Sequence, residues 1–122
     1  MILVDTSIWI DHLRHGNETL KSLLMQYRVC MHPMIIGELA CGNLRNRGQL
    51  LELWNNLPKV AVASHEEAII FLSLSNLAGR GIGYIDVHLL ASAKLQPGAR
   101  LWTGDKRLAE VADSLNLLFV LK

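Results

Sequence analysis

At residues 2–13 the chain reads ILVDTSIWIDHL. The first three residues are typical of a short buried strand, and the apolar positions of the second half recur with the period of a helix. Thr6 or Ser7 can cap that helix, because a hydroxyl oxygen accepts a hydrogen bond from a free backbone N–H group. Asp5 therefore stands where a buried strand ends and a helix begins.

The same alternation of short apolar segments and helical periods continues along the chain. Further strands are predicted at residues 29–31, 60–62, 100–103 and 117–121, and further helices at 18–26, 33–42, 50–57, 64–78, 86–95 and 106–115. Each predicted strand is almost wholly apolar, which is typical of a parallel sheet with both faces covered. The pattern predicts an α/β fold: a three-layer sandwich with a mainly parallel central sheet of about four to five strands, flanked by helices.

Length and composition narrow the classes of protein to consider. The chain has 122 residues, which fits a single domain spanning 1–122. A hydrophobic content of 51% with 19% charged residues excludes a disordered chain. No apolar run reaches the roughly 20 residues of a membrane-spanning helix. The first residues lack the basic segment of a signal peptide, so we expect a cytoplasmic protein.

Charge and cysteine content add two further limits. The formal net charge of +1 gives no overall attraction to nucleic acid, so any basic binding surface must be local. The two cysteines, Cys30 and Cys41, lie in apolar settings without the spacing of a metal site. We expect both thiols to be reduced and mostly buried.

Four acids are distinguished by their positions. Asp5 and Asp105 follow predicted strands, and ligands of parallel sheets bind at the carboxyl ends of the strands. Glu38 and Asp86 are each the only acid in an apolar segment, where an unpaired carboxylate is costly to bury. Four carboxylates brought together repel one another unless a cation lies among them. Oxygen ligands select hard divalent ions such as Mg²⁺ or Mn²⁺.

Each of these acids, taken alone, also has a purely structural interpretation. Asp5 and Asp86 are both suited to cap a helix. Glu38 fits a solvated helix residue, and the dipole of the last helix favours an acid at the position of Asp105.

Four segments of the chain resemble, in order, the motifs of one family. They are VDTSIWIDHL at 4–13, IGEL at 36–39, GYIDVHLLASA at 83–93 and LWTGDKRL at 101–108. Together they resemble PIN-domain ribonucleases, specifically the VapC-type toxins of bacterial toxin–antitoxin pairs. The resemblance implies a Mg²⁺- or Mn²⁺-dependent endoribonuclease that hydrolyses phosphodiester bonds in structured RNA and is inhibited by a cognate, VapB-like antitoxin. It also implies a homodimer, with a groove among the early helices that receives the antitoxin.

The resemblance assigns catalytic roles to four acids: Asp5, Glu38, Asp86 and Asp105. Of these, the three aspartates would hold the metal, and Glu38 would ligate or orient the attacking water. Thr6 and Thr103 match the hydroxyl positions of the family, and their hydroxyls would hydrogen-bond the ligand carboxylates or a water. Residues 88–90, His-Leu-Leu, depart from those members that carry a further acid there, which counts against a fully occupied second metal site.

A site of four carboxylates repels RNA, so cations must flank it. The candidates are Arg14, Arg45, Arg47, Arg80, Lys106 and Arg107, and of these Arg45, Arg47, Lys106 and Arg107 are the predicted RNA contacts. These side chains would hold phosphates on either side of the cleavage site. The alternative for each is ordinary solvated surface charge.

The tryptophans are expected in the core rather than in base stacking. Trp9 falls on the inward face of a helix and Trp102 in a strand. Trp54 lies in an unusually apolar helix, where an exposed patch would mark a protein interface.

Two other functions compete with the nuclease. A catalytically silent binding module of the same fold would need neither metal nor cleavage. A phosphoacceptor receiver domain has similar length and acids, but it needs paired acids after its first strand, and Asp5 is single.

Overall fold

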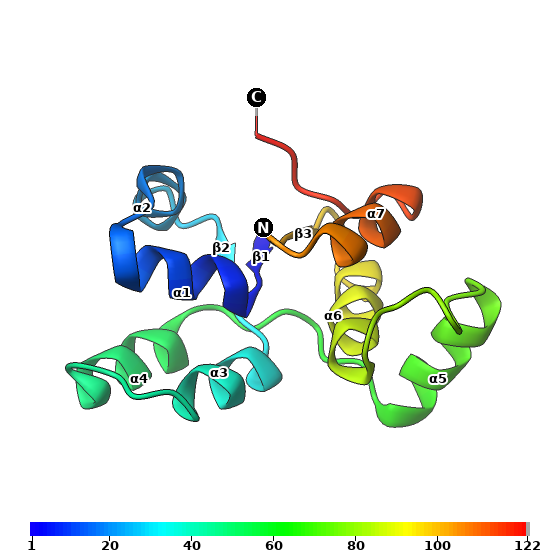
Figure 1. Ribbon diagram of the computed structural model, residues 1–122, viewed down its shortest axis with the longest axis horizontal. Coiled ribbons are helices and arrows are strands. Elements are labelled where there is room, and N and C mark those ends of the chain that lie inside the picture. Colours follow the sequence, from blue (N-terminus) through cyan, green and yellow to red (C-terminus); the bar gives the residue numbers. More distant parts are fainter. Residues whose placement is uncertain (122) are drawn as a thin grey trace.

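The computed structural model describes residues 1–121, and a parallel sheet lies at its centre (Figure 1). The middle strand is β1 (Ile2–Val4), with β2 (Val29–Cys30) on one side and β3 (Arg100–Trp102) on the other. All three residues of β1 are buried, as expected for a strand covered on both faces. The carboxyl ends of all three strands therefore lie at one edge of the sheet, which we call the carboxyl edge.

The sheet has three strands in the described part of the chain, fewer than the four to five predicted. The two missing segments lie beside the sheet, but each pairs through a single parallel bridge: Lys59 with Met31, and Leu118 with Leu101. Each bridge is supported by two backbone hydrogen bonds, which is too short a ladder to count as a strand. The sequence pattern placed both segments beside the sheet but overestimated their pairing and their burial. The first bridge lies at Lys59, just before the predicted residues 60–62, and Val62 and Val120 are 52% and 62% exposed.

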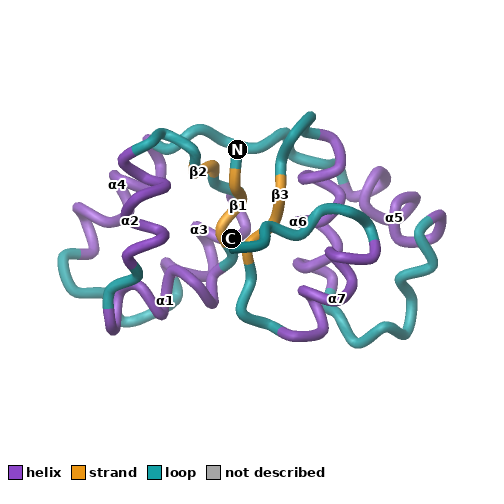
Figure 2. The backbone as a smooth tube through the Cα atoms, turned by 90° about the horizontal axis from the view of Figure 1, so that it is seen from above, coloured by secondary structure: helices purple, strands orange, loops and turns teal. Residues whose placement is uncertain are grey.

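Helices cover both faces of the sheet, which confirms the predicted three-layer α/β sandwich. They are α1 (Thr6–His15), α2 (Glu18–Met25), α3 (Pro33–Ala40), α4 (Arg47–Asn56), α5 (His65–Leu74), α6 (Tyr84–Leu95) and α7 (Lys106–Ser114). Figures 1 and 2 show α1 to α4 on one side of the strands and α5 to α7 on the other. Among residues 1–121, no helix has both the length and the apolar character needed to span a membrane.

Two helices begin earlier than predicted. The helix α4 begins at residue 47 rather than 50, and α6 begins at residue 84 rather than 86. In α6 the residue before the helix is Gly83, whose backbone N–H donates to Asp86 Oδ2 at 3.1 Å. Asp86 therefore lies at the third position of α6 instead of opening the helix.

The tryptophans pack in the core. Trp9 and Trp54 are 1% and 0% exposed, and their rings meet edge to face with centroids 5.8 Å apart. Trp102 is also buried and packs against Phe119. The core positions predicted for Trp9 and Trp102 are confirmed, and Trp54 faces the core rather than an exposed patch.

The two cysteines differ in burial. Cys30 is buried in β2, where burial raises the pKa of its thiol to about 11. Cys41 is exposed, so the prediction of two mostly buried thiols was wrong for this residue. The physical reason is its place at the C-terminal end of α3, beyond the last turn that packs on the core.

A buried histidine joins α3 to α6. His32 precedes α3 and caps it, because its Nδ1 accepts a hydrogen bond from the backbone N–H of Met34 at 3.1 Å. Its Nε2 therefore carries the proton and donates to Ser92 Oγ of α6 at 3.2 Å. Burial, helped by the charge of nearby His88, lowers the pKa of His32 to about 4. A single neutral imidazole thus connects two helices from opposite sides of the sheet.

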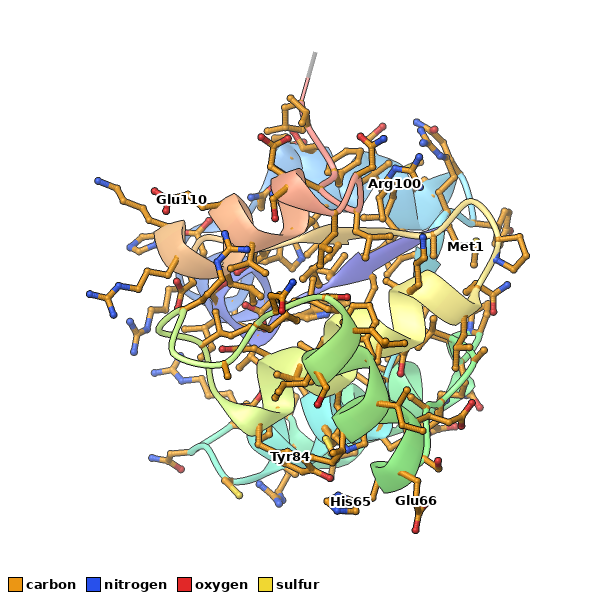
Figure 3. All side chains as sticks on the ribbon, turned by 90° about the vertical axis from the view of Figure 1, so that its right-hand side faces the viewer. Met1, His65, Glu66, Tyr84, Arg100 and Glu110 are labelled. Atoms are coloured by element: carbon orange, nitrogen blue, oxygen red, sulfur yellow. The ribbon has the colours of Figure 1, made fainter. Side chains whose placement is uncertain are left out.

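A second polar contact fixes the start of α6. The hydroxyl of Tyr84 lies 2.6 Å from Nδ1 of His65 and 2.7 Å from Nε2 of His88. Figure 3 shows Tyr84 and His65 at the same end of the molecule, where α5 and α6 begin. The first turn of α6, which carries Asp86, is held by these contacts.

Candidate active site

Asp5 is the most buried acid at the carboxyl edge. It follows β1 directly and is 8% exposed. Its backbone N–H donates to the Trp102 carbonyl at 2.9 Å, and its Oδ1 accepts from the backbone N–H of Thr6 at 2.8 Å. Asp5 is therefore itself the cap of α1, and the prediction that Thr6 or Ser7 caps this helix was wrong.

Two hydroxyls converge on the other oxygen of Asp5. Thr103 Oγ1 donates to Asp5 Oδ2 at 2.7 Å, and Ser7 Oγ donates to the same oxygen at 3.2 Å. Each hydroxyl also accepts a backbone N–H: Thr103 from Asp105 at 3.1 Å, and Ser7 from Gly104 at 3.0 Å. The carboxylate after the first strand is thus tied to the loop after the last one.

Sequence reasoning assigned Thr103 to this environment and missed Ser7. The sequence does place a hydroxyl, that of Ser7, two residues after Asp5, but it was interpreted only as a helix cap. The contact of Ser7 with Gly104 joins positions 97 residues apart, so no local pattern reveals it.

Asp105 lies at the same edge, just before α7. Its Oδ1 accepts from the backbone N–H of Leu108 at 3.1 Å, which makes it the cap of that helix. The residue is exposed. Its structural role therefore uses one carboxylate oxygen and leaves the other to the site.

Glu38 approaches from α3. Its Oε1 accepts from the hydroxyl of Thr6 at 2.8 Å, and its side chain is exposed. This bond brings the acid of α3 to the first residue of α1, next to Asp5. The hydroxyl of Thr6 thus contacts Glu38, one of the four predicted acids.

Asp86 completes the group from α6. Its carboxyl is partly buried, and this burial raises its pKa. The hydrogen bond from Gly83 acts in the opposite direction, and the charges of Asp5, Asp105 and Glu38 raise the pKa further. The charges of the other three predicted acids therefore all act on the carboxyl of Asp86.

Within residues 1–121, none of these four acids forms an ion pair with a basic side chain. The single ion pair among residues 1–121 joins His15 and Asp11 on α1, at 3.3 Å. Within the same residues, no three His, Cys, Asp or Glu side chains stand close enough together to surround one ion. The donor set nevertheless fits a hard divalent cation, because it consists of carboxylate oxygens that lack a counter-charge. Such an ion would be held partly through water.

The predicted cations lie on two sides of the acids. Arg45 lines a groove of about 380 Å³ that also contains Glu38 and Arg14. Arg47, at the start of α4, donates to the Gly42 carbonyl at 3.3 Å through one guanidinium nitrogen. Arg45 therefore shares the lining of this groove with Glu38, whereas Arg47 lies at the start of the neighbouring helix.

The groove is formed by α1, α3, α4 and the loop between the last two helices, and we call it the helix groove. Its lining is Ile10, Leu13, Arg14, Glu38, Leu39, Gly42, Asn43, Leu44, Arg45 and Leu50. Most of these side chains are apolar, with charged groups of both signs.

Lys106 and Arg107 occupy the first turn of α7, next to Asp105, and both are exposed. Arg107 packs on Gly81 of the loop before α6: a Cβ atom at Gly81 would come within 2.5 Å of the guanidinium. Gly81 also has a φ of +82°, which favours glycine. Arg107 thus links the element of Asp105 to the loop that leads to Asp86.

Comparisons with known proteins agree with this architecture. Residues 2–114 match the family model described as PIN domain. The chain is 46% identical over 108 residues to Ribonuclease VapC32 from two strains of Mycobacterium tuberculosis, covering 88% of this chain and 87% of that protein.

Among solved structures, the crystal structure of FitAcB from Neisseria gonorrhoeae is similar, with a TM-score of 0.65. The superposition covers 93% of this chain and 94% of that chain at 23% identity. At this identity the likeness supports the fold alone.

Proposed function

This chain belongs to the PIN domain family, and from this premise we propose that it is an endoribonuclease that depends on Mg²⁺ or Mn²⁺. The observation that carries the proposal is the group of four carboxylates at the carboxyl edge, without a neutralising side chain among residues 1–121. The identity to a protein named Ribonuclease VapC32 supports RNA as the substrate. Family membership excludes the receiver domain, and we propose one nuclease domain over residues 1–122.

We assign metal binding to the three aspartates of the site, Asp5, Asp86 and Asp105. Asp86 and Asp105 each keep one carboxylate oxygen that accepts no hydrogen bond from residues 1–121. The bound ion would neutralise charge on the scissile phosphate and lower the pKa of a water. Thr103 and Ser7 hold the Asp5 carboxylate in one orientation through their hydroxyls.

Glu38 has the role of orienting the attacking water. Its Oε1 is occupied by the hydroxyl of Thr6, which leaves Oε2 to accept a proton from that water. Arg45 lies beside it in the helix groove and would contact a phosphate of the RNA, with Lys106 and Arg107 on the side of Asp105. Arg47 completes the proposed set of phosphate contacts from the start of α4. Structured RNA is the proposed substrate class.

The test is cleavage of a pool of small structured RNAs with added Mn²⁺, added Mg²⁺ or EDTA. We expect metal-dependent cleavage by the wild type and its loss in Asp5→Asn, which keeps the shape of the side chain and removes its charge. Asp113→Asn, at an exposed acid of α7, is the matched control and should retain activity.

Three results would decide against the nuclease. Cleavage that persists in EDTA would exclude metal dependence, and wild-type cleavage by Asp5→Asn would exclude the site. If the wild type neither binds Mn²⁺ nor cleaves any RNA of the pool, the silent binding module is the better description.

We also propose that the helix groove receives an amphipathic segment of a cognate, VapB-like antitoxin. Its lining combines apolar side chains with Arg14, Arg45 and Glu38, so it offers both an apolar floor and charges that specify a partner. The groove includes Glu38, so its occupant would block the site. The test is calorimetry of antitoxin binding to the wild type and to Leu13→Asp, which places a charge in the groove. We expect weaker binding to the variant, and an unchanged affinity would place the antitoxin elsewhere.

For the homodimer, we propose the outer face of α5. Ile70 and Leu74 are 58% and 79% exposed on this face. Glu66 and Glu67 lie at the start of α5, and Arg80 follows its end. In an antiparallel pairing of two copies, the acids of one copy would therefore approach Arg80 of the other. Light scattering of the wild type and of Ile70→Glu tests the oligomeric state. We expect a dimer for the wild type and a monomer for the variant; a monomeric wild type, or a dimer that survives the substitution, would contradict this interface.

A further inference from the structure

Ser7 makes two hydrogen bonds that together connect the two ends of the site. Its hydroxyl donates to Asp5 Oδ2 at 3.2 Å and accepts from the backbone N–H of Gly104 at 3.0 Å. A serine hydroxyl has one proton, and here that proton is committed to the carboxylate while a lone pair is committed to the loop. The orientation of the hydroxyl is therefore fixed from both sides.

The adjacent hydroxyl repeats this arrangement. Thr103 Oγ1 donates to the same Asp5 oxygen at 2.7 Å and accepts from the backbone N–H of Asp105 at 3.1 Å. Two consecutive backbone N–H groups, those of residues 104 and 105, are thus bound by two hydroxyls that share one acceptor. The loop that carries Asp105 has two parallel connections to Asp5.

Resting on the proposed function, we propose that Ser7 is a positioning residue that sets the spacing between Asp5 and Asp105 for a divalent cation. Thr103 follows β3 directly and restrains one side of the loop that leads to Asp105. Ser7 comes from α1 and restrains the loop from the other side, so the loop cannot pivot about the Thr103 contact. Without Ser7, Asp105 keeps its cap on α7 but loses its fixed distance from Asp5.

The surroundings allow Ser7 to be changed without disturbing the core. Ser7 is exposed and lies in the first turn of α1. A Cβ atom at Gly104 would lie 3.5 Å from the Ser7 hydroxyl, which is ordinary contact, so the two segments are not tightly wedged. Ser7→Ala removes both hydrogen bonds, and Ser7→Thr keeps a hydroxyl at the same position.

The first measurement is amide hydrogen exchange of the metal-free protein by NMR. In Ser7→Ala we expect the Gly104 amide to lose protection, while the Asp105 amide stays protected through Thr103. Ser7→Thr should restore protection at Gly104, and Ser73→Ala, at an exposed serine of α5, should change neither amide. Unchanged protection of Gly104 in Ser7→Ala would overturn the proposal, whether or not the protein binds metal.

The second measurement is the affinity for Mn²⁺ by calorimetry. Loss of a group that orients a metal ligand typically costs 10- to 100-fold in affinity or activity, so we expect about tenfold weaker binding in Ser7→Ala. Ser7→Thr should bind within about twofold of the wild type. The Mn²⁺ concentration for half-maximal RNA cleavage should rise in Ser7→Ala.

The outcomes separate the two proposals. Wild-type Mn²⁺ affinity in Ser7→Ala, or equal loss in Ser7→Ala and Ser7→Thr, would overturn the role of the Ser7 hydroxyl. A wild type that shows the Gly104 protection but binds no Mn²⁺ would refute the proposed function and with it the purpose assigned to Ser7, while the hydrogen-bonded connection itself would stand.

Discussion

Acidification should destabilise the protein through one buried side chain, His32. In the folded state its Nδ1 accepts the hydrogen bond that caps α3, and burial lowers its pKa from 6.5 to about 4. The unfolded chain therefore binds a proton on this residue near pH 6.5, and the folded protein does not until about pH 4. Stability from the neutral imidazole is fully present above pH 6.5 and is lost as the pH falls toward 4.

The expected size follows from these two pKa values. Each pH unit between them removes roughly 1.4 kcal/mol, so about 3 kcal/mol is lost between pH 6.5 and pH 4. Other groups titrate over the same range, so the effect must be isolated by substitution. His32→Asn suits this purpose, because asparagine also caps helices and does not titrate.

The assay is urea denaturation followed by circular dichroism at pH values from 7 to 4. We expect the free energy of unfolding of the wild type to fall by about 3 kcal/mol more than that of His32→Asn over this range. His15→Gln, which removes an exposed histidine of α1, should follow the wild type. Parallel curves for the wild type and His32→Asn would refute the assignment of the acid sensitivity to His32.

Three further predictions concern the site and its supports. Asp86→Asn should raise the melting temperature of the metal-free protein at pH 7, because burial and three neighbouring charges disfavour this carboxylate; calorimetry that shows a lower melting temperature would contradict this. Ser64→Ala should cost about 1 kcal/mol in urea denaturation by removing the capping box of α5, whereas Ser73→Ala should cost much less. Gly81→Ala should cost at least about 1 kcal/mol, because of the φ of +82° and the contact with Arg107; an unchanged denaturation midpoint would show that the loop adapts freely.

The helices and the position of the site were predictable because they depend on local patterns. Apolar periodicity reports which residues are buried, and it located all seven helices of the described chain. Asp5 and Asp105 could be placed at one edge because parallel strands end on the same side. The capping role of Asp5 and the place of Asp105 at the start of the last helix were also predicted as alternatives to a functional role. Each cap uses only one carboxylate oxygen, so it is compatible with the proposed role in metal binding.

The features that the sequence did not predict depend on contacts between residues far apart in the chain. The apolar segment 117–121 predicts a buried strand, but only Leu118 pairs with the sheet and Val120 is 62% exposed, which the local pattern does not reveal. The exposure of Cys41 depends on where α3 ends relative to the core. The contact of Ser7 with Gly104 requires that the first and last strands be neighbours, which strand order alone decides.

The position of β1 in the middle of the sheet has a consequence for synthesis. This strand is made before both of its neighbours, and β3 is made only after the helices α1 to α6. A nascent chain that stops before residue 100 leaves one side of β1 unpaired and lacks both Thr103 and Asp105. For a protein proposed to cut RNA, the ribosome that makes it therefore holds an incomplete site until residue 105 has been added.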